Sequence, residues 1–301
     1  MKEIKILTDA LDVWSKQYKA YGDYSVTTLL DSPRIVQLTR RHKDEIVRPP
    51  EQQVSAFIGS CVHAGFEKSL RLQSLIDDRY DIERTVFDKI EDRLITGKFD
   101  ILLNQRHLYD IKTCKTWKHV FDPQHREWTE QLNLYAYLLQ RRGVEVRSIN
   151  IIALYLDWVE REMLARPEYP RKPVEEYELT LWYYEDADLF IKDKIKTMKA
   201  AEEMPDEHLP LCTSDQMWEW NIDGQFAVLK DDKAQRAARK FDTMVEAVAY
   251  AKEKGHAIVE KRLPVRTRCE KWCDVNKWCN QYAEYVNKRD ASGKSVERVT
   301  V

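Results

Sequence analysis

The stretch from Arg93 to Thr113 constrains the fold more than any other part of this sequence. Apolar residues dominate two runs, 94–103 and 108–111, and the polar residues Asn104–Arg106 separate them. This pattern predicts two β-strands joined by a turn. Charged residues interrupt the apolar pattern at Asp100, Asp110 and Lys112. Because an unpaired buried charge is costly, these three side chains need a partner, an ion or solvent.

The alternation of side chains along a strand brings these charges together. Asp110 and Lys112 are two residues apart, so they project from the same face of their strand. Asp100 lies on the neighbouring strand and is expected to converge with them across the hairpin. Two carboxylates and a lysine at one point on a sheet favour a site for a hard divalent cation and an activated water.

Two predicted helices flank the hairpin and carry further polar residues. On the first, over residues 55–75, His63 and Glu67 are neighbours one turn apart beside an apolar stripe. A half-buried His63 bonded to Glu67 would by itself explain that pair. On the second, over residues 127–142 and ended by Gly143, Gln131 and Tyr135 face the same way. Tyr135 alone is equally consistent with an ordinary core aromatic.

Taken in order, these residues resemble the motifs of the RecB-type branch of the PD-(D/E)xK nuclease superfamily. The matching motifs are Gly59-x3-His63-x3-Glu67, Gly97-x2-Asp100, Asp110-x-Lys112 and Gln131-x3-Tyr135. An isolated Asp-x-Lys is a weak signal, whereas four motifs in order, each on the expected secondary structure, are specific. The resemblance covers roughly residues 55–160. It implies an α/β (α+β) fold, in which helices flank a mixed central β-sheet with a restriction-endonuclease-like core.

The resemblance also implies a role for each motif residue. One or two Mg²⁺ or Mn²⁺ ions would be held by His63, Asp100, Asp110 and the carbonyl group of Ile111. Lys112 would orient the attacking water or stabilise the developing charge. Gln131 would bond phosphate, the water or a catalytic side chain, and Tyr135 would line the site. Glu67 is the weaker candidate for a supporting position.

Four of the six cysteines lie in the C-terminal third of the chain, at Cys212, Cys269, Cys273 and Cys279. They are as many as a metal centre needs, but they lack the paired Cys-x2-Cys knuckles of common zinc sites. They resemble the cysteine-held [4Fe–4S] cap of iron–sulfur members of the same branch. Two departures stand out: the remote ligand is Cys212, whereas the usual N-terminal position holds Ser32, and the first triplet gap is three residues rather than two. Zn²⁺ at these cysteines, or unligated thiols, are the alternatives.

Changes in pattern along the chain predict four segments. These are an N-terminal helical segment 1–50, a nuclease core 51–205, a small inserted α/β unit 206–263, and a cysteine-rich cap and tail 264–301, frayed after about residue 288. A loop expected over 115–126 interleaves basic and aromatic residues that could grip phosphate and stack a base, or simply be solvated. The basic residues of the insert likewise suit either a nucleic-acid backbone or solubility alone.

Composition restricts the remaining possibilities. A net charge of −2 excludes a globally basic nucleic-acid binder, so any DNA-binding surface must be local. The chain has no apolar run of about 18 residues, which excludes a transmembrane helix and a membrane partner. The first residues have no apolar signal core behind them, so a cytoplasmic protein is expected. Six cysteines in such a protein do not predict a disulfide framework.

The sequence therefore predicts a metal-dependent deoxyribonuclease, an exonuclease in DNA recombination, repair or phage DNA metabolism. An endonuclease is one alternative, and a non-catalytic nucleic-acid-binding protein on the same fold is another. The sequence carries no Walker-type phosphate-binding motif, so any helicase would be a separate partner, as would a single-strand annealing protein.

Overall fold

The computed structural model describes residues 5–15, 21–75, 78–122, 124–220, 225–231, 233–234, 236–256, 258–262, 264–291 and 297–300. The chain divides into two compact units. One comprises Met1–Asp31 and Arg48–Ala200, and the other comprises Ser32–Val47 and Ala201–Val301. The predicted segment 1–50 is therefore shared between the two units.

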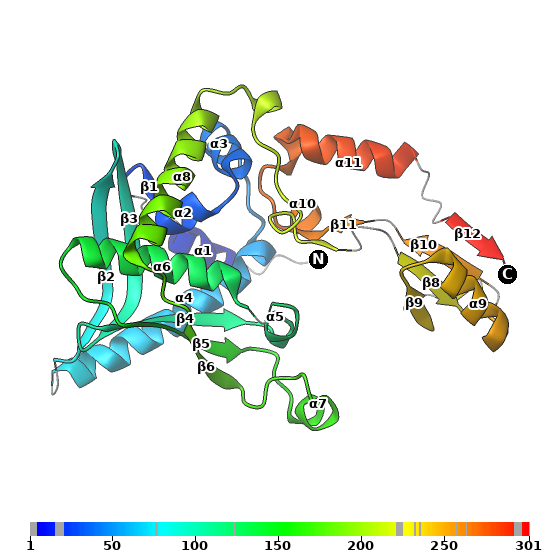
Figure 1. The fold of residues 1–301 in the computed structure, drawn as a ribbon, viewed down its shortest axis with the longest axis horizontal. Coiled ribbons are helices and arrows are strands. Elements are labelled where there is room, and N and C mark those ends of the chain that lie inside the picture. The colour runs from blue at the N-terminus through cyan, green and yellow to red at the C-terminus, as the bar shows by residue number, and fades with distance from the viewer. Residues whose placement is uncertain are drawn as a thin grey trace. The chain divides into compact units, whose positions relative to one another are not determined.

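The first unit is built on a mixed six-stranded sheet (Figure 1). Its strands are β1 (Tyr24–Ser25), β2 (Tyr80–Ile90), β3 (Arg93–Leu103), β4 (His107–Cys114), β5 (Ser148–Tyr155) and β6 (Val174–Leu179). β2, β3 and β4 form an antiparallel meander, β5 joins β4 in parallel, and β6 runs antiparallel to β5. This arrangement confirms the predicted mixed sheet. The strand–helix–strand order over residues 107–155 predicts a crossover between two parallel strands, and β4 and β5 are parallel.

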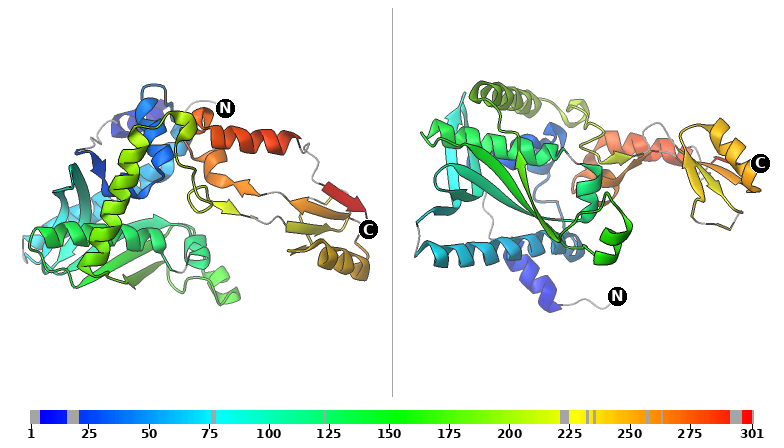
Figure 2. Two further views of the ribbon diagram at one scale, coloured as in Figure 1. Left: turned by 45° about the horizontal axis from the view of Figure 1, so that its top comes forward. Right: turned by 60° about the horizontal axis from the view of Figure 1, so that its bottom comes forward.

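The helices of this unit are α1 (Lys5–Ser15), α2 (Val26–Leu30), α4 (Pro50–Ser74), α5 (Thr116–Phe121), α6 (Arg126–Arg141), α7 (Glu160–Ala165) and most of α8 (Tyr184–Glu202). In the right-hand view of Figure 2 the strands lie between α4 and α6. α6 buries every apolar side chain that it carries. It ends at Arg141, and Gly143 follows with φ +82°, a backbone conformation that glycine adopts without steric cost.

Two sequence-based predictions need correction here. The loop expected over residues 115–126 contains the helix α5, whose N-cap residue Lys115 makes no side-chain capping bond. The largely apolar run 144–158 predicts one long, buried strand, but the strand is shorter and is confined to β5. Among the described helices, none combines the length and the apolar character needed to cross a bilayer.

The second unit has two small cores. Around the first lie α3 (Pro33–Arg41), α10 (Thr267–Lys271), α11 (Asn280–Ala291), the 3₁₀ turns Asp206–His208 and Asn276–Trp278, and the paired strands β7 (Glu219–Trp220) and β11 (Val265–Arg266). Leu38, Ala201, Leu209 and Val275 fill this core, and Cys273 and Cys279 pack against it.

The second core belongs to a four-stranded antiparallel sheet in the order β12-β10-β8-β9. The elements are β8 (Gln225–Leu229), β9 (Arg239–Phe241), α9 (Met244–Lys254), β10 (Ile258–Arg262) and β12 (Glu297–Thr300). α9 begins at its N-cap Thr243 and packs Ala247 and Ala251 against the sheet. The prediction of a frayed tail is wrong for residues 297–300, which pair with β10; residues 292–296 lie outside the described part.

Candidate active site

The centre of the candidate site is a fork between β3 and β4. These strands pair from Leu103–His107 to Ile101–Tyr109 and then separate. The next facing positions are Asp100 and Asp110, whose side chains point to the same face and are only 10% and 4% exposed. Asp100 Oδ2 accepts a hydrogen bond from the backbone N–H of Ile111 at 2.7 Å, which fixes its carboxylate across the fork.

Lys112 and α6 complete one side of this fork. Lys112 Nζ lies 2.7 Å from Asp110 Oδ2 and donates to Gln131 Oε1 at 3.0 Å. Gln131 Nε2 in turn donates to Tyr135 Oη at 3.0 Å and approaches Asp110 Oδ1 at 3.4 Å. The close packing of α6 depends on Gly97, where a Cβ atom would lie 2.7 Å from the Tyr135 ring. The structure thus brings all these predicted residues together.

α4 supplies the other side of the fork. His63 Nδ1 lies 3.3 Å from Asp100 Oδ1 and 3.6 Å from Glu83 Oε1. Glu67, one turn further along the helix, accepts a hydrogen bond from Arg71 at 2.9 Å instead. Among the described residues, His63, Glu83 and Asp100 are the one group of three potential metal ligands whose donor atoms lie within 4.8 Å of one another.

Glu83 is a site residue that the sequence reasoning missed. The β2–β3 register pairs Ile82 with Ile101 and Arg84 with Phe99, so Glu83 faces Asp100. Its φ is +53°, an uncommon conformation for a residue other than glycine. The signal that could have revealed it is the two-residue turn Glu91–Asp92, because a hairpin turn sets the register of the strands that it joins.

The charges of the site compensate one another. Contact with Asp100, and then with Glu83, raises the pKa of His63 to about 10 despite its partial burial. Burial raises the pKa of Asp110 to about 6, and Lys112 opposes this shift. Burial disfavours ionisation of Glu83, but the bonds from His63 and Lys98 outweigh it and lower its pKa. At neutral pH a protonated His63 therefore lies among carboxylates, in a place where a divalent cation would replace its proton.

The donor atoms suit a hard cation. Asp100 and Glu83 offer carboxylate oxygens and His63 an imidazole nitrogen, a set suited to Mg²⁺ or Mn²⁺. Asp110 Oδ2 is in ion-pair contact with Lys112 but accepts no well-directed hydrogen bond from a described residue. The carboxylate of Asp110 therefore retains a lone pair that an ion could use.

A second candidate metal site lies in the second unit. Cys212, Cys269, Cys273 and Cys279 line one cavity together with Arg34, and we call this the cysteine cavity. Cys212 Sγ lies 3.2 Å from the hydroxyl oxygen of the buried Ser32. Cys61 on α4 and Cys114 on β4 belong to the first unit and lie outside this set.

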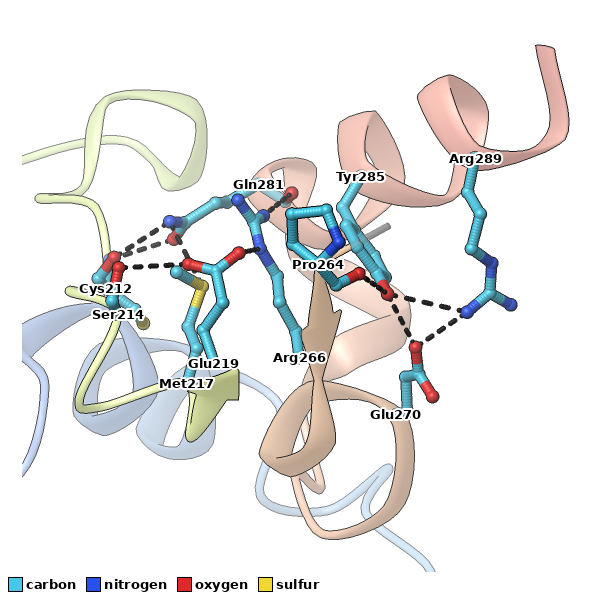
Figure 3. Close-up of polar contacts among 10 residues, drawn as sticks. All are labelled: Cys212, Ser214, Met217, Glu219, Pro264, Arg266, Glu270, Gln281, Tyr285 and Arg289. Atoms are coloured by element: carbon cyan, nitrogen blue, oxygen red, sulfur yellow. Dashed lines mark hydrogen bonds and ion pairs between the residues drawn. The ribbon is translucent and has the colours of Figure 1, made fainter. Parts of the chain in front are cut away.

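A polar network surrounds Cys212 (Figure 3). The Gln281 side chain accepts from the N–H of Cys212 at 2.8 Å and donates to its carbonyl at 2.9 Å. Arg266 bonds Glu219 at 2.9 Å and donates to the carbonyl of Gln281 at 3.4 Å. The backbone of the remote cysteine is therefore held to the segment that carries the other three.

Burial keeps the thiols of Cys212, Cys269 and Cys273 protonated by raising their pKa values. It raises the pKa of Cys269 to about 12 and that of Cys273 to about 11, and neighbouring thiols contribute to both shifts. Thiols of this kind ionise at neutral pH when a metal binds them. No three of the four sulfurs lie within 4.8 Å of one another among the described residues.

Comparisons with known proteins give distant likenesses. No family model and no curated protein matches the sequence. The solved structure of SSO0001 shares 18% identity at a TM-score of 0.46, over 65% of this chain and 86% of that chain. An alkaline exonuclease (LHK-Exo) from Laribacter hongkongensis shares 15% sequence identity at a TM-score of 0.27, over 46% of this chain and 66% of the exonuclease chain. A phage related exonuclease from Haemophilus somnus 129PT shares 11% sequence identity at a TM-score of 0.25, over 66% of this chain and 78% of the exonuclease chain. At these TM-scores the likeness assigns no activity to this chain.

Proposed function

We propose that this chain is a metal-dependent DNA nuclease of the PD-(D/E)xK type, acting as an exonuclease on phosphodiester bonds. The observation that carries the proposal is the convergence of Asp100, Asp110 and Lys112 in the fork between β3 and β4. Burying two carboxylates side by side raises the energy of the folded chain unless a cation compensates them. Such an arrangement is typical of a site that binds a metal ion and a phosphate.

The residues of the fork have distinct roles in this proposal. His63, Glu83 and Asp100 hold Mg²⁺ or Mn²⁺, with Asp110 and the Ile111 carbonyl beside them. The bound ion supplies Lewis acidity and lowers the pKa of a water molecule. Lys112 is a point cation for the charge that develops on the scissile phosphate, and Gln131 Oε1 positions its ammonium group at 3.0 Å. Tyr135 holds Gln131 in turn.

The segment that follows β4 offers a place for the DNA strand. Lys118 is engaged by Asp122 and Glu127, and the ring of His125 stacks on Trp128. Trp117 on α5 is 44% exposed. Arg166 lies over its ring, 5.7 Å from the ring centre. In the proposed function the exposed part of Trp117 stacks on a base of the DNA, because stacking on an aromatic ring binds single strands without sequence preference. A helicase or a single-strand annealing protein would be a separate partner.

We further propose that the four cysteines hold a [4Fe–4S] cluster. Among the described residues, no three of their sulfurs lie within 4.8 Å of one another, whereas Zn–S bonds of about 2.3 Å place the sulfurs around a tetrahedral Zn²⁺ about 3.8 Å apart. Four soft donors around a larger centre suit iron and sulfide. Zn²⁺ is the alternative that metal analysis of the purified protein would reveal.

The deciding experiment is a cleavage assay on end-labelled linear DNA and on closed circular DNA, with Mn²⁺ or with EDTA. We expect linear DNA alone to be shortened, and Lys112→Ala to lower the rate by about 10²–10³-fold, the typical loss when a charge-stabilising group is removed. The matched control is Lys89→Ala. Lys89 is an exposed lysine on β2, six residues and about 20 Å from Glu83. Its replacement should leave the rate unchanged.

The other outcomes separate the alternatives. Cutting of closed circles would assign an endonuclease. If no DNA is cut under any metal, by protein whose cysteine centre is intact, the enzyme proposal fails and a non-catalytic binding protein replaces it.

A further inference from the structure

Arg34, on α3 of the second unit, is a buried cation. Its side chain is 1% exposed and is among the largest fully buried side chains of the molecule. The guanidinium donates to the carbonyl groups of Pro210 and Leu209 and to the side-chain oxygen of Asn280. All three acceptors are neutral. Among the described residues no carboxylate lies within ion-pair distance of Arg34.

A buried cation of this kind needs a negative charge nearby. Arginine stays protonated in proteins, so Arg34 cannot escape the penalty by losing its proton. Neutral oxygens satisfy its N–H groups but do not balance its charge, and a buried charge without a counter-ion is strongly destabilising. The positive charge of Arg34 is therefore balanced only if an anion binds beside it, because no described carboxylate does so.

The cysteine cavity is the place where that anion would lie. Arg34 lines it together with Cys212, Cys269, Cys273 and Cys279. Four thiolates carry four negative charges, and a [4Fe–4S]²⁺ cluster or a Zn²⁺ ion offsets two of them. The complete centre would thus carry two negative charges in a buried place.

The three hydrogen bonds of Arg34 also link it to the remote ligand. Two of their acceptors, Leu209 and Pro210, shortly precede Cys212, and the third, Asn280, precedes Gln281. Gln281 in turn holds the backbone of Cys212 (Figure 3). The same guanidinium thus fixes the two chain segments that meet at this corner of the cavity.

Arg268 also lines this cavity, but Arg34 is the more deeply buried of the two arginines. We propose that Arg34 is an internal counter-cation of an anionic metal–thiolate centre held by the four cysteines. This inference rests on the proposed cysteine centre and specifies how the fold stabilises it. Arg34 is a positioning residue and touches no substrate. Its positive charge favours the more negative, reduced state of a cluster and slows the loss of metal.

The test compares four full-length proteins: wild type, Arg34→Gln, Arg34→Lys and Arg41→Met. Each is reconstituted without oxygen with ferrous iron and sulfide, or with Zn²⁺ alone. Glutamine retains hydrogen-bond donors but removes the charge, whereas lysine keeps the charge and loses the planar fork. Arg41 is the matched control, because it lies on the same helix and also donates to chain carbonyls, but it pairs with Asp206.

The readouts are the rate of metal transfer to a chelator and, for iron, the reduction potential of the centre. We expect Arg34→Gln to lose metal about 10–100-fold faster, as when other groups supporting a metal site are removed. Its potential should become more negative. Both control variants should keep the reduction potential of the wild type, even where their melting temperatures fall. Arg34→Lys retains the positive charge at position 34, and Arg41→Met removes a charge that does not line the cysteine cavity.

The results that would overturn the inference are distinct. Equal potentials and equal metal loss in wild type and Arg34→Gln would show that the charge has no such role, while the centre itself would stand. A potential shifted in Arg34→Lys as far as in Arg34→Gln would assign the effect to hydrogen bonding alone. If Arg34→Gln does not fold, the reduction potential of Arg34→Lys decides. A potential equal to that of the wild type supports the role of the charge, and a shifted potential refutes it. Wild-type protein that takes up neither iron nor zinc would instead refute the cysteine centre.

Discussion

The hydroxyl oxygen of Ser32 lies 3.2 Å from the sulfur of Cys212, although 180 residues separate them in the chain. Ser32 is fully buried and Cys212 is 8% exposed. The resemblance places a cluster cysteine near Ser32, where this chain has none. The contact shows that a sulfur on either residue would reach nearly the same corner of the cysteine cavity.

The first prediction is an exchange of these two residues. Cys212→Ser should lower the bound metal, because a hydroxyl is a poor substitute for a thiolate toward iron or zinc. The double variant Ser32→Cys/Cys212→Ser should restore it. Iron, sulfide and zinc contents of the purified proteins measure the effect, with Cys61→Ser as the control. A double variant as poor in metal as the single one would show that the two positions are not equivalent.

The second prediction concerns Glu83 and its position opposite Asp100. Glu83→Ala removes one of the three donors that lie within 4.8 Å of one another. We expect the Mn²⁺ dissociation constant to rise about 10–100-fold. Calorimetric titration of the metal-free protein measures it.

Glu91→Ala is the matched control for Glu83. Glu91 is also a glutamate at positive φ, 54°, but it lies in the β2–β3 turn at the far end of the strand. Its replacement should leave Mn²⁺ binding unchanged. Equal affinities of all three proteins would exclude Glu83 from the metal site.

The sequence predicted the hairpin and the fork because both follow from side-chain alternation within a few residues. Asp100, Asp110 and Lys112 stand out where apolar residues are expected. Glu83 does not, because several acidic and basic residues are interspersed among the apolar residues of β2 and each resembles a solvated position. Its role depends on the register between two strands and on a backbone conformation that no local pattern encodes.

The second unit illustrates the same limit. The triplet Cys269, Cys273 and Cys279 is visible as a local cluster, whereas the pairing of Cys212 with Ser32 is a contact between distant segments. The need of Arg34 for a counter-charge is likewise invisible in the sequence, since exposed arginines are common and only its burial makes it unusual.

The third prediction is a release of protons when metal binds. The pKa of His63 is about 10 in the folded metal-free protein and 6.5 in an unperturbed side chain. Since the folded value is the higher one, protonated His63 stabilises the fold fully below about pH 6.5. This contribution is lost as the pH rises through about 10. Metal must displace that proton, so the affinity for Mn²⁺ should increase with pH across the same window.

Calorimetry in buffers of different ionisation enthalpy measures the release. At pH 8 we expect about one proton per ion for wild type, as His63 changes from protonated to neutral. His63→Asn should release almost none at this pH. Equal proton release by both proteins would show that His63 is not displaced by the metal.

The last prediction tests the packing that positions Gln131. A methyl group at Gly97 would lie 2.7 Å from the Tyr135 ring and 3.3 Å from Val26. Gly97→Ala should therefore lower the free energy of unfolding by about 1–3 kcal/mol, the usual cost of overpacking a core. It should also slow cleavage, because a displaced Tyr135 releases the amide of Gln131 that it holds at 3.0 Å.

Gly65→Ala is the control: no atom lies within 4 Å of the new methyl group, and alanine favours the helix by up to about 1 kcal/mol. Urea unfolding measures both variants. A Gly97→Ala protein as stable and active as wild type would show that α6 can shift without disturbing the fork.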